Sequence, residues 1–158
     1  MLRSAHMLGN EEEIIFTATD LLADTKLAPE LSNEAHYYRA KAYLDAGKTD
    51  GAMEDLKVLA KDTRNVYGAE AKYKVAQIYF DGGQTDKAEQ EVLNYIEVST
   101  PHTYWLARSF VLLADVYMKL GRNLDAKQYL LSLKQNYQAD DDIAGMIESR
   151  LEKLKTEN

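Results

Sequence analysis

The feature that most constrains the fold is a set of five positions that recurs three times along the chain. Residues 35–56, 71–92 and 109–130 align without gaps. Each segment has a small residue, a tyrosine three positions later, a glycine four after that, an alanine five beyond the glycine, and a large aliphatic residue four further on. These positions hold Ala40, Tyr43, Gly47, Ala52 and Leu56, then Ala76, Tyr79, Gly83, Ala88 and Val92, then Ala114, Tyr117, Gly121, Ala126 and Leu130. Successive glycines lie 36 and 38 residues apart, so we infer that the chain is built from repeated units.

The spacing of apolar residues predicts helices and no sheet. Apolar side chains recur at three- and four-residue intervals, and no useful stretch alternates with period two. Helices are expected at 2–8, 11–24, 32–46, 49–63, 67–81, 85–98, 101–119, 123–136 and 141–155. A small residue lets two helices approach closely while the larger residues fill the space around it, so each segment predicts a helical hairpin.

Several residues mark the expected helix ends. The repeat glycines fall where a helix ends, a position that favours a left-handed backbone. Two residues after each glycine stands a candidate N-cap of the next helix, namely Thr49, Thr85 and Asn123. Thr100 and Pro101 predict a further N-cap followed by proline in the first helical position, and Pro29 is expected in a turn.

These residues resemble the tetratricopeptide repeat (TPR), a helix–turn–helix unit of about 34 residues with the pattern W-x2-L-G-x2-Y, then A-x3-F, then P. The Ala-x2-Tyr pairs are similar to G-x2-Y with Ala in place of Gly, and Ala-x3-Leu or Ala-x3-Val is similar to A-x3-F. The chain departs from the pattern at the Trp and Leu positions, which hold His36, Lys72 and Phe110, and Arg39, Val75 and Leu113. The resemblance implies an all-α fold: a right-handed superhelical α-solenoid of antiparallel helix hairpins with a C-terminal capping helix.

The resemblance also implies how the chain is organised. Residues 1–158 are expected to form a single TPR-like domain with a partial repeat, 1–31, three repeats, 32–66, 67–100 and 101–139, and a capping helix, 140–156. Because Gly9 lies 38 residues before Gly47, the chain is expected to begin inside a repeat and to be a fragment of a longer protein. The capping helix is expected to bury its apolar stripe and to present Ser149, Lys153 and other polar residues to water.

Composition and motifs argue against several classes of function. The chain has 19 Lys and Arg against 26 Asp and Glu, a formal charge of −7, which disfavours nucleic-acid binding. It has no cysteine, and His6, His36 and His102 do not have metal-ligand spacing. No apolar run approaches the roughly 20 residues of a membrane helix, so direct membrane insertion is not expected. We therefore expect no enzyme activity, no cofactor and no metal.

In TPR arrays the first helix of each repeat lines an inner groove that holds a peptide or a segment of another protein. By the resemblance, the partner-binding residues are Tyr37, Lys41, Leu44, Tyr73, Gln77, Phe80, Arg108, Val111, Asp115 and Met118. Their three- and four-residue steps keep them on one face of each helix. The Lys and Asn pairs by which chaperone-binding TPR domains clamp a C-terminal carboxylate are missing, so such a clamp is disfavoured. An extended or helical partner segment with apolar and some basic character is expected instead.

Two functions remain open at this point. The first is a non-catalytic scaffold that binds a protein or peptide segment in the groove. The alternative is a set of structural spacer repeats, without a ligand of their own, inside a larger envelope protein. Residues 99–143 resemble the C-terminal repeats of long bacterial cell-envelope TPR proteins, which favours a periplasmic or cell-envelope location and leaves a cytoplasmic one open. The sequence identifies neither the partner nor the oligomeric state.

Overall fold

The computed structural model describes residues 10–156, and these residues form an all-α fold. The described part of the chain contains eight helices and no strand: α2 (Glu11–Leu22), α3 (Pro29–Asp45), α4 (Thr49–Leu59), α5 (Val66–Asp81), α6 (Thr85–Val98), α7 (Thr103–Lys119), α8 (Asn123–Asn136) and α9 (Ile143–Thr156). The expected all-α class is confirmed. The helix expected at 2–8 lies outside the described residues.

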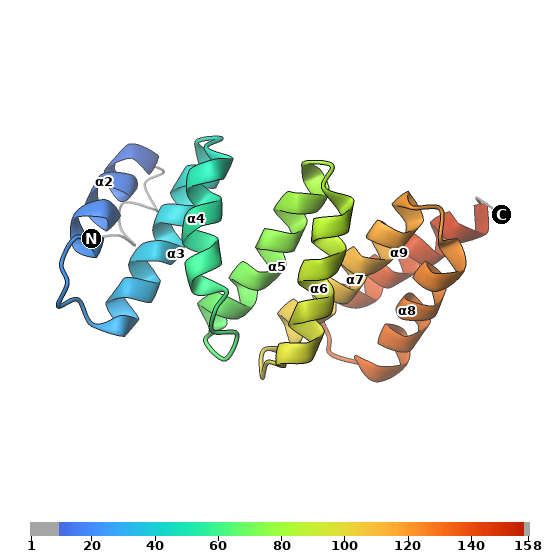
Figure 1. Cartoon of the computed structure of the whole chain (residues 1–158). Helices are drawn as coiled ribbons and strands as arrows, with labels where there is room; N and C mark the ends of the chain where they lie inside the picture. The colour runs from blue at the N-terminus through green and yellow to red at the C-terminus, as the bar shows by residue number, and fades with distance from the viewer. Residues whose placement is uncertain (1–9, 157–158) are drawn as a thin grey trace.

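The helices form an elongated solenoid of antiparallel hairpins. The pairs α3–α4, α5–α6 and α7–α8 pack as hairpins, and each first helix also contacts the first helix of the next hairpin. Figure 1 shows them following one another, from α2 at one end to α9 at the other. At the far end α9 packs on both α7 and α8, so it occupies the place that the first helix of a further hairpin would take.

The recurring small and aliphatic positions lie at the contacts inside these hairpins. Ala52, Ala88 and Ala126 have no exposed surface, and the aliphatic residues that follow them are at most 2% exposed. The small residues of the preceding helices, including Ala40 and Ala76, are at most 1% exposed. Because alanine has no side chain beyond Cβ, the two helix backbones can approach closely at these positions. The repeat seen in the sequence is therefore a repeat of helix–helix contacts.

The turn inside each hairpin is the same in all three copies. Gly47, Gly83 and Gly121 have φ of 75°, 80° and 77°, so the expected left-handed ends are confirmed. The residue after each glycine donates its backbone N–H to the carbonyl of the repeat tyrosine, at 2.7 Å from Lys48 to Tyr43. The equivalent bonds in the next two hairpins are both 2.8 Å long. These bonds are those of a Schellman motif.

The expected N-caps of the second helices are wrong by one residue. Thr49, Thr85 and Asn123 are the first residues of α4, α6 and α8, and Lys48, Gln84 and Arg122 occupy the cap positions without a side-chain cap bond. The Schellman turn leaves one residue between the glycine and the next helix. The backbone N–H of that residue is bonded to the tyrosine carbonyl, so the turn itself fixes the backbone at the cap position.

Two other helix starts also differ from the expectation. Pro29 is the first residue of α3 rather than part of a turn, a position where its missing N–H is not needed. Helix α7 begins at Thr103, because Thr100 and Pro101 belong to the preceding turn. The Thr100 hydroxyl donates to the Thr63 carbonyl at 2.5 Å, and the Thr63 hydroxyl donates to the Ser99 carbonyl at 2.8 Å. These bonds join the α6–α7 turn to the α4–α5 turn.

Polar residues at the Trp and Leu positions of the first hairpin have a buried partner. Asp55 on α4 is 1% exposed. It accepts hydrogen bonds from Arg39 Nε at 2.8 Å and Arg39 Nη2 at 2.7 Å, and its other contact is His36 Nδ1 at 2.8 Å. Arg39 also donates to the Thr19 hydroxyl at 3.1 Å, so this cluster joins α2, α3 and α4.

Candidate functional site

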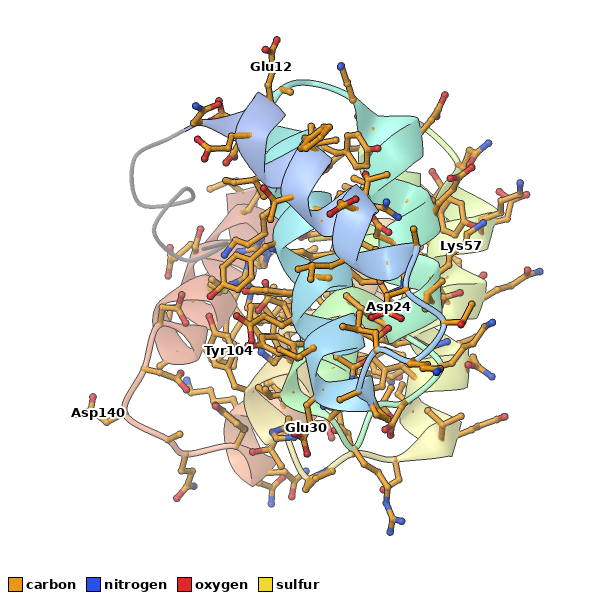
Figure 2. The ribbon with its side chains drawn as sticks, turned by 90° about the vertical axis from the view of Figure 1, so that its left-hand side faces the viewer. Glu12, Asp24, Glu30, Lys57, Tyr104 and Asp140 are labelled. Atoms are coloured by element: carbon orange, nitrogen blue, oxygen red, sulfur yellow. The ribbon has the colours of Figure 1, made fainter. Side chains whose placement is uncertain are left out.

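The residues expected to contact a partner lie on the first helices of the hairpins. We call the face made by α3, α5, α7 and α9 the first-helix face. Figure 2 looks along the array from its α2 end and places Tyr104 of α7 on one side and Lys57 of α4 on the other. The first-helix face and the face of the second helices are therefore opposite flanks of the solenoid. Polar side chains join each first helix to the next.

At the junction of α3 and α5, Tyr37 is bonded across the two helices. Its hydroxyl donates to Glu70 at 3.0 Å and accepts from Lys41 Nζ at 3.1 Å. Its ring lies 4.4 Å from the ring of Tyr67, centroid to centroid, and the Lys41 ammonium lies 5.0 Å from the Tyr37 centroid. Burial and the neighbouring Glu70 carboxylate raise the pKa of Tyr37, which therefore remains a neutral hydrogen-bond donor.

At the junction of α5 and α7, the Arg108 guanidinium is enclosed by aromatic rings. It lies 4.8 Å from the ring centroid of Tyr73 and 5.8 Å from those of Tyr104 and Trp105. Its Nη2 donates to the Tyr73 hydroxyl at 3.0 Å and its Nη1 to the Tyr104 hydroxyl at 2.9 Å. The Tyr73 hydroxyl donates in turn to Gln77 at 2.8 Å. Both terminal nitrogens of Arg108 and the Tyr73 hydroxyl thus have partners within the protein.

At the junction of α7 and α9, Arg150 makes a two-pronged ion pair with Asp115. The Nε–Oδ1 and Nη2–Oδ2 distances are 2.9 and 3.0 Å. Arg150 also donates to the Met146 carbonyl of its own helix at 3.2 Å. A second bond across this junction runs from the Tyr104 hydroxyl to Asp142 at 2.9 Å. These contacts fix α9 against the side of α7.

A depression of about 550 Å³ opens on the first-helix face where α5, α7 and α9 meet. It is lined by Phe80, Asp115, Met118, Lys119, Ser149, Arg150 and Lys153. Phe80 and Met118 are half-buried and supply apolar surface, while the Lys119 ammonium lies 5.6 Å from the Phe80 ring centroid. The lining of the depression therefore combines apolar and charged side chains.

The ten expected residues do not share one environment. Phe80, Asp115 and Met118 line the depression, whereas Tyr37 with Lys41, and Tyr73 with Gln77 and Arg108, form the two polar junctions described above. Leu44 is half-buried on α3.

Two of the expected residues have little surface to offer a partner. Val111 is 3% exposed and belongs to the buried cluster of α5 to α9, so it offers almost no surface to a partner in this structure. Tyr73 is 6% exposed, and among the described residues its hydroxyl already has partners.

Two functional candidates on α9 are missing from the expected set. The sequence places Lys153 in water as part of a capping helix and assigns no role to Arg150. The signal that identifies Arg150 is its distance of 35 residues from Asp115, close to the repeat interval. Extending the repeat register into α9 therefore predicts that Arg150 and Lys153 belong to the first-helix face.

Other kinds of site were sought in the described residues. Residues 10–156 contain no group of three or more His, Asp or Glu side chains placed to hold a metal ion. Within the same residues, no helix combines the length and the apolar character needed to cross a membrane.

Comparison with known protein families finds matches in two segments of the chain. Two family models of the tetratricopeptide repeat match, one over residues 34–62 and the other over residues 107–136. The first match covers most of α3 and all of α4, and the second covers most of α7 and all of α8. No curated protein and no solved structure matches the chain.

Proposed function

This chain is a tetratricopeptide repeat protein, and from that premise we propose that it is a non-catalytic scaffold whose first-helix face binds a segment of a partner protein. Tetratricopeptide repeats are generally protein–protein interaction modules. The partner is a protein or a peptide rather than a nucleic acid, since the chain carries a formal charge of −7.

The observation that carries this proposal is the depression between α5, α7 and α9. Phe80 and Met118 offer apolar surface inside a concave site, which is the arrangement that anchors a side chain of a bound segment. Met118 suits this role because its flexible thioether adapts to different ligand shapes. Lys41 and Gln77 lie further along the same face and extend it toward α3.

The test selects peptides that bind the folded protein and then measures their affinity for a variant with one substitution that leaves the charge unchanged. Met118→Ser removes apolar surface from the depression, and the matched control Leu124→Ser removes it from α8, where Leu124 is 71% exposed. Selected peptides are expected to bind Met118→Ser about tenfold more weakly and Leu124→Ser as tightly as the wild type, by fluorescence anisotropy. Equal binding to both variants contradicts the proposal.

The spacer function is the second candidate, and the junctions between first helices favour it. Tyr37, Tyr73 and Asp115 direct their polar atoms to the neighbouring helix, an arrangement that sets the spacing and curvature of the array. A spacer without a ligand predicts that the selection yields no peptide specific for the first-helix face. The same experiment therefore separates the two functions.

A further inference from the structure

We propose that the depression between α5, α7 and α9 selects an acidic partner segment, one that carries side-chain carboxylates next to an aromatic or aliphatic residue. This inference rests on the proposed function, since it names the chemistry of the segment that the first-helix face binds. It also departs from the expectation drawn from the sequence, which favoured a segment with some basic character.

The local charge of the depression is opposite to that of the chain. The chain as a whole carries a formal charge of −7. The lining of the depression holds three cationic side chains, Lys119, Arg150 and Lys153, against one carboxylate, Asp115. A concave site of one sign concentrates ligands of the other sign, so this part of an acidic protein attracts carboxylates.

The two lysines are available for a partner, whereas Arg150 is not. The Nε and Nη2 atoms of Arg150 donate to Asp115, and its Nη1 donates to the Met146 carbonyl. Lys119 and Lys153 are exposed, and no carboxylate within residues 10–156 forms an ion pair with either ammonium. Lys119 comes from the end of α7 and Lys153 from α9, so the two ammonium groups approach the depression from different helices.

The apolar part of the lining decides which acidic ligand fits. Phe80 on α5 and Met118 on α7 line the same depression as the two lysines, and the Lys119 ammonium is 5.6 Å from the Phe80 ring centroid. A bound segment can place an apolar side chain on Phe80 and Met118 while neighbouring carboxylates reach the lysines. A long polyanion would gain only these two cations and would meet the acidic remainder of the chain, which favours a short acidic stretch of protein.

The experiment is a selection from a library of random decapeptides displayed without a free carboxyl terminus, using the whole chain as bait. The enriched peptides are then made with amidated ends and their affinities are measured for Lys119→Glu/Lys153→Glu. The control Lys26→Glu/Lys127→Glu changes the net charge by the same amount. Both of its lysines are exposed and lie outside the depression. Circular dichroism confirms that each variant is folded.

Enriched peptides are expected to contain two or more Asp or Glu near an aromatic or aliphatic residue. They are expected to lose at least tenfold in affinity for Lys119→Glu/Lys153→Glu and less than threefold for the control. Peptides that lose affinity for Met118→Ser but not for Lys119→Glu/Lys153→Glu overturn this inference and leave the proposed function standing. A selection that enriches no peptide for the first-helix face overturns both.

Discussion

The Lys72 ammonium on α5 lies 2.7 Å from a carboxylate oxygen of Glu91 on α6, at the place where the two helices of the middle hairpin meet. The same two repeat positions, 36 residues earlier, hold His36 and Asp55, which are 2.8 Å apart. Departures from the TPR pattern at the Trp position are therefore matched by a change on the facing helix.

The third hairpin makes this contact with aromatic rings. Phe110 and Tyr129 lie 38 residues after Lys72 and Glu91, and their ring centroids are 6.2 Å apart. The same contact is thus made by histidine and aspartate in the first hairpin, by lysine and glutamate in the second, and by two aromatic rings in the third. In each hairpin the two facing side chains are complementary. This explains how a chain with a polar residue at the Trp position still forms the hairpin.

We expect the middle hairpin to tolerate the aromatic pair of the third hairpin only when both Lys72 and Glu91 are replaced. Lys72→Phe alone leaves Glu91 without its ion pair, and Glu91→Tyr alone leaves the buried Lys72 with only its 2.6 Å bond to Asn94. Each single variant is expected to lose about 1–3 kcal/mol in the free energy of unfolding. The double variant copies the third hairpin and is expected to regain at least about 1 kcal/mol of the summed losses, by urea denaturation. Strictly additive losses would show that the two positions are independent.

Asp55 is expected to make the free energy of unfolding fall at acidic pH. Burial alone raises the pKa of this carboxyl, but the hydrogen bonds and charges of Arg39 and His36 outweigh burial and hold the pKa below its ordinary value of 3.8. Because the pKa is lower in the folded state, Asp55 stabilises the fold above about pH 4, and this contribution is lost as the pH falls through the folded-state pKa.

Urea denaturation from about pH 2.5 to about pH 7 measures this effect. Asp55→Asn is expected to cost about 2–3 kcal/mol near neutral pH and to flatten the decline in stability below about pH 4. Asp140→Asn makes the same chemical change at an exposed position and is expected to leave the decline unchanged. An identical acid profile for Asp55→Asn and the wild type would refute the assigned role of Asp55.

The hairpins are predictable from sequence because their landmarks act locally. A glycine at the end of a helix and an alanine at a close helix contact meet the same requirement in every copy, so Gly47 and Ala52 predict what the structure shows. Burial on the first-helix face depends instead on the sizes of neighbouring side chains. The helical register predicts the face on which Val111 lies, but the neighbours that cover it are not encoded at position 111.

The residues that α9 adds to the first-helix face are not predicted from the sequence, for a different reason. An amphipathic helix at the end of a solenoid is expected to bury one stripe and to present the rest to water. In the structure α9 also adds Arg150 and Lys153 to the first-helix face, because it continues the row of first helices. The repeat interval predicts that position only if the final helix is counted as part of the next repeat.

Gly68 is expected to tolerate no side chain. It lies in the first turn of α5, where a Cβ would stand 1.8 Å from the Asp62 carbonyl oxygen and 2.5 Å from that of Leu59. Gly68→Ala must therefore move the α4–α5 turn and is expected to cost about 3 kcal/mol in the free energy of unfolding. The matched control is Gly145→Ala in α9, where an added Cβ meets nothing within 4 Å. That control is expected to gain about 0.5–1 kcal/mol, and thermal and urea denaturation distinguish the two signs.

Ala88 tests the central claim that the repeat pattern is a pattern of close helix contacts. It lies on α6 with no exposed surface, at the position that Ala52 and Ala126 occupy in the other hairpins. Ala88→Leu introduces three carbon atoms where the backbones of α5 and α6 approach, and it is expected to cost about 1–3 kcal/mol in the free energy of unfolding. Ala144→Leu adds the same atoms at an exposed position of α9 and is expected to change stability by less than about 0.5 kcal/mol. If urea denaturation gave the two variants equal stability, alanine at this repeat position would not be required by packing, and the recurrence would need another cause.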